Sequence, residues 1–92
     1  MGITLSAIDS ILVTEDIEGL IEAGAPADEY VDEAAQLTAS IENLVREDIN
    51  EASILALISA IWLKSFELSK DDMELRLPAL RRVAHKIFNL AV

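Results

Sequence analysis

The chain lacks cysteine, and it has only one histidine, three glycines and two prolines in 92 residues. Without cysteine, disulfides, thiolate catalysis and cysteine-ligated zinc or iron–sulfur centres are excluded. Because small secreted domains commonly depend on disulfides, we expect a cytoplasmic protein. Aromatic residues make up 4% of the chain, and the apolar residues are mostly alanine, isoleucine and leucine. This composition is typical of helices joined by short loops.

Long apolar runs are also missing. The longest uncharged run covers residues 52–63, whereas a membrane-spanning helix needs about 20 apolar residues. We therefore expect no membrane partner and interpret the run as a buried helix. The N-terminal residues carry no basic flank and no cleavage signature, so we expect no secretory signal.

Basic residues are scarce in the first two thirds of the chain. Residues 1–63 contain 13 acids and one base, while residues 64–92 contain six bases and four acids, and the net charge is −10. Phosphate contacts need a basic surface, so nucleic acid is not expected as a partner. A basic protein partner fits this charge, although an acidic surface also simply keeps a small domain soluble.

Helical periodicity, by contrast, is present throughout. Residues 4–23 predict either two short helices or one bent helix, with Thr4 or Ser6 as the first cap, a second start at Thr14 and an end at Gly24. Residues 26–46 predict one helix. Its buried stripe consists of Tyr30, Ala34, Leu37, Ile41 and Leu44.

The third helix is expected to begin after Asn50, a good N-cap. It is apolar around most of its circumference, which predicts the central and most buried helix, with Trp62 inside. Ser69 and Asp72 resemble a cap for a short helical turn over residues 70–76, and Pro78 predicts a restart in the first turn of a last helix. The buried stripe of that helix consists of Leu80, Val83, Ala84 and Ile87. These segments predict an all-α fold, a single compact four- to five-helix bundle formed by residues 1–92 as one helical domain.

The stretch GAPADEYVDEA, residues 24–34, concentrates acids around a single tyrosine. One interpretation is purely structural: Asp28, Glu29, Asp32 and Glu33 lie in the first two turns of a helix, where acids are favoured, and Tyr30 starts the buried stripe. The other is a binding site, since carboxylates spaced by four residues share one side of a helix.

Chemistry at a metal or cofactor is not expected. The calcium-loop pattern D-x-D-x-D-G is absent, and His85 has no glutamate at the spacing of a di-iron bundle. An H-E-x-x-H motif and a glycine-rich phosphate loop are absent as well. We therefore predict a protein that is not an enzyme and has no cofactor.

Residues 8–41 resemble a family of small bacterial proteins of unknown function, the YugE-like group. The resemblance rests on the motif Asp-x-x-Gly-Leu, here residues 16–20, followed by Pro-x-Asp-Glu-Tyr, here residues 26–30. Ile17 stands where that family usually has proline. The resemblance implies an all-helical fold and marks residues 26–30 as a region of interest, but it implies no activity. Charge, size and fold class are also similar to those of acidic bacterial toxin-immunity proteins such as the colicin nuclease inhibitors, by analogy alone.

The leading hypothesis is a small, acidic, non-enzymatic interaction protein of bacterial type that binds a basic protein partner, with an immunity or inhibitor role as one version. Its candidate binding residues are Asp16, Asp28, Glu29, Tyr30, Asp32 and Glu33. The alternative is a structural homo-oligomer, because a hydrophobic content of 52% exceeds what one small core needs. In that alternative Arg81, Arg82 and Lys86 would face the acids of a second copy. A metal-binding or enzymatic domain is the least favoured.

Overall fold

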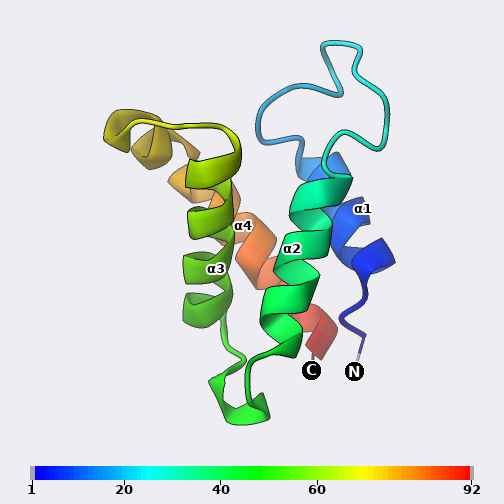
Figure 1. The fold of residues 1–92 in the computed structure, drawn as a ribbon, viewed down its shortest axis with the longest axis vertical. Coiled ribbons are helices and arrows are strands. Elements are labelled where there is room, and N and C mark those ends of the chain that lie inside the picture. Colours follow the sequence, from blue (N-terminus) through cyan, green and yellow to red (C-terminus); the bar gives the residue numbers. More distant parts are fainter. Residues whose placement is uncertain (1, 92) are drawn as a thin grey trace.

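The computed structural model describes residues 2–91, and within them the chain forms four α-helices, one 3₁₀ turn and no strand. The elements are α1 (Leu5–Glu15), α2 (Val31–Glu42), η1 (Arg46–Asp48), α3 (Glu51–Ser65) and α4 (Lys70–Ala91). Figure 1 shows the four helices side by side, with a long loop between α1 and α2 at one end of the bundle. The predicted all-α fold is confirmed.

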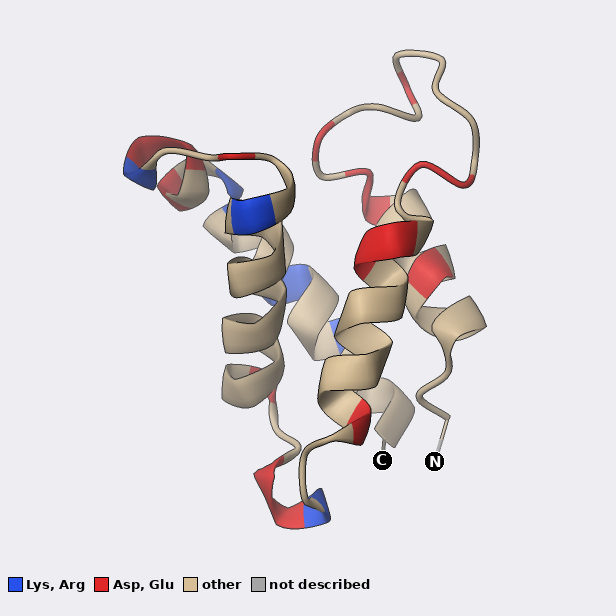
Figure 2. Cartoon of the chain, viewed as in Figure 1, with Lys and Arg blue, Asp and Glu red and all other residues tan. Residues whose placement is uncertain are grey.

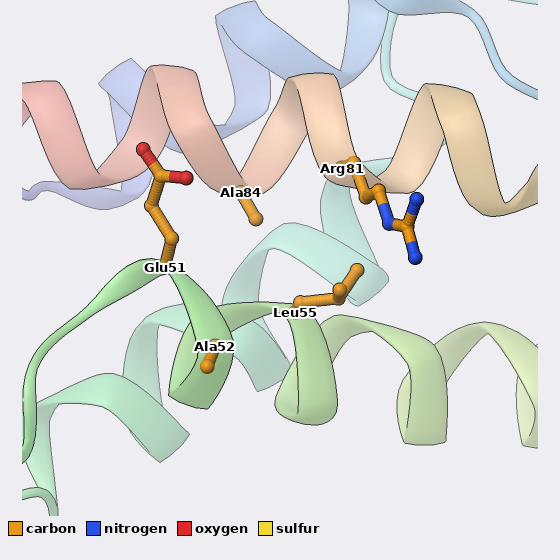
Figure 3. Close-up of a pocket in the computed structure, with 5 residues that line it drawn as sticks. All are labelled: Glu51, Ala52, Leu55, Arg81 and Ala84. Atoms are coloured by element: carbon orange, nitrogen blue, oxygen red, sulfur yellow. The ribbon is translucent and has the colours of Figure 1, made fainter.

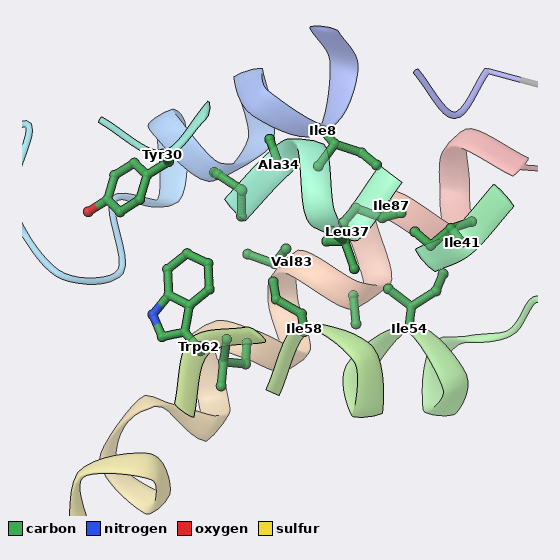
Figure 4. Close-up of a cluster of buried hydrophobic side chains, with 13 residues drawn as sticks. Ile8, Tyr30, Ala34, Leu37, Ile41, Ile54, Ile58, Trp62, Val83 and Ile87 are labelled. Atoms are coloured by element: carbon green, nitrogen blue, oxygen red, sulfur yellow. The ribbon is translucent and has the colours of Figure 1, made fainter. Parts of the chain in front are cut away.

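The helices form a closed ring around one core, because α1 packs on α2 and α4, and α3 packs on α2 and α4. The radius of gyration of 12.4 Å is that of a compact domain. Figure 4 shows the core side chains projecting inward from all four helices. The fully enclosed hydrophobic residues are Ile8, Leu12, Tyr30, Ala34, Leu37, Ile41, Ile54, Ile58, Trp62, Leu80, Val83, Ala84 and Ile87.

The helix starts follow their capping residues. The hydroxyl of Thr4 accepts a hydrogen bond from the Ala7 amide at 3.1 Å, and the side chain of Asn50 accepts one from the Ser53 amide at 2.8 Å. Ser69 and Asp72 bond to each other's amides in a reciprocal capping box. The predicted caps at Asn50 and Ser69 are thus confirmed, and Thr4 rather than Ser6 starts the first helix.

Both alternatives predicted for residues 4–23, two short helices or one bent helix, are wrong, because α1 ends at Glu15. Thr14 and Glu15 belong to the last turn of α1, and residues 16–30 form an irregular loop of turns. The reason is Asp16, which adopts a left-handed conformation with φ of 45° and ends α1. The helical spacing of Ile17, Leu20 and Ile21 has another origin: these half-buried side chains pack against the core from the loop.

The start of the second predicted helix is also corrected. α2 begins at Val31 rather than near Pro26, so Asp28 and Glu29 precede the helix and form no i, i+4 pairs on its surface. Its predicted stripe is confirmed from Tyr30 to Ile41, and Leu44 lies just beyond the helix end, half-buried.

Two predictions about the second half differ from the structure. α3 is not buried all round: Ile54, Ile58 and Trp62 face the core, whereas Leu63 is 47% exposed. α4 runs without interruption through Pro78 instead of restarting there. Loss of one backbone hydrogen bond and a ring clash make this proline unfavourable by about 3 kcal/mol. Contacts on both sides offset that penalty, because Arg76 is bound to Glu18 and Leu80 is fully buried.

Within residues 2–91, no helix has both the length and the apolar character that crossing a membrane requires.

Candidate functional site

The loop of residues 16–30 contains most of the residues that the sequence marks as candidates. It lies beyond the ends of α1 and α2 (Figure 1), and acidic residues are spread along it and into the first turn of α2 (Figure 2). Although the loop is irregular, three of its side chains are held by specific hydrogen bonds.

Asp16 organises the first half of the loop. Its carboxylate accepts hydrogen bonds from the amides of Ile21 and Glu22, at 3.1 and 3.0 Å, and from the Tyr30 hydroxyl at 2.7 Å. The bond from Tyr30 is the main reason why the pKa of Asp16 is lowered. Burial and the same hydrogen bond raise the pKa of Tyr30, so the tyrosine stays protonated and donating. Asp16 and Tyr30 are thus engaged with each other inside the chain.

Glu18 connects the loop to α3 and α4. Its carboxylate accepts hydrogen bonds from Trp62 Nε1 at 2.8 Å and from Arg76 Nε and Nη2 at 2.6 and 2.9 Å. The Glu18 side chain is only 9% exposed and that of Arg76 25%. Burial raises the pKa of Glu18, but the bonds from Arg76 and Trp62 outweigh it and leave the pKa lowered. The pair is a bidentate ion pair, the geometry in which guanidinium binds carboxylate most strongly.

The two sets of bonds join at Glu18 and Tyr30, because the Glu18 amide also donates to the Tyr30 hydroxyl at 3.3 Å. The Tyr30 ring stacks on Trp62 with centroids 5.9 Å apart, and Figure 4 shows both rings at the loop end of the core. We call Asp16, Glu18, Tyr30, Trp62 and Arg76 the polar anchor. It ties the loop to the start of α2 and to α3 and α4.

The sequence prediction included Asp16 and Tyr30 but missed Glu18 and Arg76. Glu18 could not be distinguished among so many acids. Arg76 did carry a signal, because it lies at a position of the apolar stripe formed by Met73, Leu77 and Leu80. A single arginine on such a stripe indicates a partly buried charge that needs a carboxylate partner.

The remaining predicted residues form the acidic rim, which we define as Asp28, Glu29, Asp32 and Glu33. Asp28, Glu29 and Asp32 are exposed, and Glu33 is half-buried. Partial burial, together with the charges of Asp32 and Glu29, raises the pKa of Glu33. Within residues 2–91, none of the four carboxylates forms a salt bridge. The rim therefore concentrates negative charge that the described chain does not neutralise.

Three acids outside the rim, Glu15, Glu18 and Glu51, are bonded to basic side chains. Glu15 accepts from Lys86 at 2.6 Å and from Arg82 at 3.1 Å, which lowers the pKa of Glu15. Glu51 is paired with His85, whose ring also contacts Asn89. Arg82 and Lys86, predicted as possible contacts to a second copy, are thus already bonded to Glu15.

In the described part of the chain, no group of three or more histidine, cysteine, aspartate or glutamate side chains has the arrangement of a metal site. The geometry defines a helical domain with an anchored loop and an unpaired acidic rim. Comparison with protein-family models, with curated proteins and with solved structures gives no match. The resemblance to the YugE-like group stays a prediction.

Proposed function

We propose that this protein is a non-enzymatic interaction protein whose acidic rim binds a basic surface of a protein partner. The observation that carries the proposal is the contrast between the acids. Glu15, Glu18 and Glu51 each bond to a basic side chain of another element, whereas the four unpaired rim acids lie within six consecutive residues, and the charges of Asp32 and Glu29 raise the pKa of Glu33. Like charges held close together weaken the fold slightly, so a partner that neutralises them gains binding energy.

In this proposal the candidate residues have two roles. Asp16 and Tyr30 contribute by fixing the loop that carries Asp28 and Glu29, and Asp32 and Glu33 lie in the first turn of α2. A partner would approach the rim under the attraction of a net charge of −10. Such steering raises association rates and makes them fall with salt. An inhibitor or immunity role, in which the rim covers a basic enzyme surface, is one form of this function.

The test compares two variants of equal charge. The rim variant carries Asp28→Asn, Glu29→Gln, Asp32→Asn and Glu33→Gln. The control carries Glu42→Gln, Glu47→Gln, Asp48→Asn and Glu74→Gln, four exposed acids outside the rim. Both are used to capture partners from a lysate of the host at low and at high salt. We expect wild type and control to retain a basic protein that salt releases, and the rim variant to lose it. Equal loss from both variants would show that only bulk charge matters, and retention by both would remove the rim from the site.

A further inference from the structure

The outer face of α3 has no partner among the described residues, and it carries no charged side chain between Glu51 and Lys64. Residues 52–63 carry no charge, and Ala52, Ala56, Ala60 and Leu63 along this face are exposed. Figure 2 shows α3 without charged residues between its two ends. Since the chain as a whole has 26% charged residues, this uncharged helix face differs clearly from the rest of the surface.

A groove of about 330 Å³ runs beside this face, between α3 and α4. Its floor is formed by Ala52 and Leu55 from α3 and Ala84 from α4, while Glu51 and Arg81 stand at its edges. Figure 3 shows Glu51 toward one end of the groove and Arg81 toward the other, with the three apolar side chains between them. The groove thus has opposite charges at opposite ends and an apolar centre.

This arrangement is self-complementary. If a second copy is related to the first by a 180° rotation about an axis through the middle of the groove, Arg81 of each copy lies opposite Glu51 of the other. Arg81 is exposed and forms no side-chain hydrogen bond within residues 2–91, and Glu51, half exposed, is bonded there to His85 through one of its two oxygens. Both charged groups can therefore accept a further partner.

Repulsion between the two acidic loops does not oppose this contact strongly. The loop of residues 16–30 lies beyond the ends of α1 and α2, at one end of the bundle, whereas the outer face of α3 runs along its side (Figure 1). In a dimer through α3 the acids of this loop stay away from the contact, and charges separated by more than about 8–10 Å are largely screened.

We infer that this protein forms a two-fold symmetric dimer through α3 and the α3–α4 groove. The two α3 helices pack antiparallel through their N-terminal halves, around Ala52 and Ala56, and two Glu51–Arg81 ion pairs join the copies. The paired segments are short, so the interface is at the small end of specific contacts, where association is weak and reversible. This inference does not depend on the proposed function, because it uses neither the acidic rim nor the loop.

The test is sedimentation equilibrium over a concentration series. For the wild type we expect the mass to rise with concentration from 10.1 kDa toward twice that value. Ala56→Arg, which places a charge in the middle of the α3 face, should remain monomeric. Ala39→Arg, at an exposed position of α2, is the matched control and should dimerise like the wild type. Far-UV circular dichroism checks that both variants are folded.

A mixing experiment tests the ion pairs directly. Arg81→Glu alone and Glu51→Arg alone each create two repulsive pairs across the axis, and each should be monomeric. In a heterodimer of the two variants, one original pair is kept and the other is reversed in sign, so an equimolar mixture should dimerise again. The inference is overturned if the wild type is monomeric up to about 1 mM, a limit of roughly −4 kcal/mol in binding free energy. It is equally overturned if Ala56→Arg still dimerises or if mixing restores nothing.

Discussion

Replacing Glu18 by glutamine removes the charge to which Arg76 and Trp62 are bonded, while it keeps the shape of the side chain. In the native chain Oε2 accepts two hydrogen bonds and Oε1 accepts one. A glutamine amide has one acceptor oxygen, and its NH₂ group can only donate. Whichever way the amide is turned, at least one of the three hydrogen bonds is lost and one N–H group faces another.

The size of the effect follows from the exposure of the pair. A hydrogen bond to a charged group contributes about 1.5–3 kcal/mol, and breaking a fully buried ion pair costs about 3–5 kcal/mol. Because the Arg76 side chain is 25% exposed, water can bond to its guanidinium group and replace part of the lost interaction. We therefore expect Glu18→Gln to lower the free energy of unfolding by about 2–3 kcal/mol. In a domain of this size each kcal/mol lowers Tm by about 4–8 °C.

Urea unfolding followed by tryptophan fluorescence measures this loss. Trp62 is the only tryptophan, and its indole N–H donates to Glu18, so the signal comes from the perturbed site. Glu22→Gln is the control, because Glu22 is exposed in the same loop and only its backbone amide is hydrogen-bonded. If the two variants lose the same small amount, of about 0.5 kcal/mol or less, the polar anchor does not stabilise the fold as argued.

The pH dependence gives a second check with a defined sign. The pKa of Glu18 is lowered in the folded chain, so its contribution is fully present above the unfolded pKa of about 4.3 and is lost as the pH falls through the lower folded value. The stability difference between wild type and Glu18→Gln should be constant near neutral pH and shrink on acidification below about 4.3. A difference that grows on acidification would contradict the assignment.

Two further substitutions test the core and α4. Trp62→Ala empties a fully buried position and should lower the free energy of unfolding by about 3–5 kcal/mol, measured by circular dichroism in urea; a loss below about 1 kcal/mol would show that the indole is not packed as described. Pro78→Ala restores a helical N–H group and should raise stability by about 2 kcal/mol, since the gain of about 3 kcal/mol in helix propensity is reduced by the greater freedom of the unfolded chain. A destabilised Pro78→Ala protein would mean that the proline ring makes a contact that the helix needs.

The structure could be predicted best where hydrophobic periodicity and capping residues determine it. The stripe from Tyr30 to Ile41 and the cap at Asn50 follow from neighbouring residues alone, and both are as predicted. These features depend on interactions within one helix turn, which a sequence displays directly.

The predictions were wrong where contacts between residues far apart in the sequence determine the structure. Whether residues 16–30 form a helix depends on Asp16, whose carboxylate binds Tyr30, 14 residues away. Whether α4 continues past Pro78 depends on contacts to other parts of the bundle, such as Arg76 to Glu18, 58 residues away. Tertiary contacts of this kind override local propensity and leave little trace in a single sequence.

The polar anchor has a consequence for the thermodynamics of binding at the acidic rim. Fixing the backbone of one residue costs about 1–2 kcal/mol, and the loop between α1 and α2 has 15 residues. Because the anchor fixes this loop when the chain folds, a partner of the rim does not have to order it again on association. Arg76→Met, a change on α4 outside the rim, would return part of that entropy to the free protein. Affinity at the rim would then fall without the loss of a single contact to the partner.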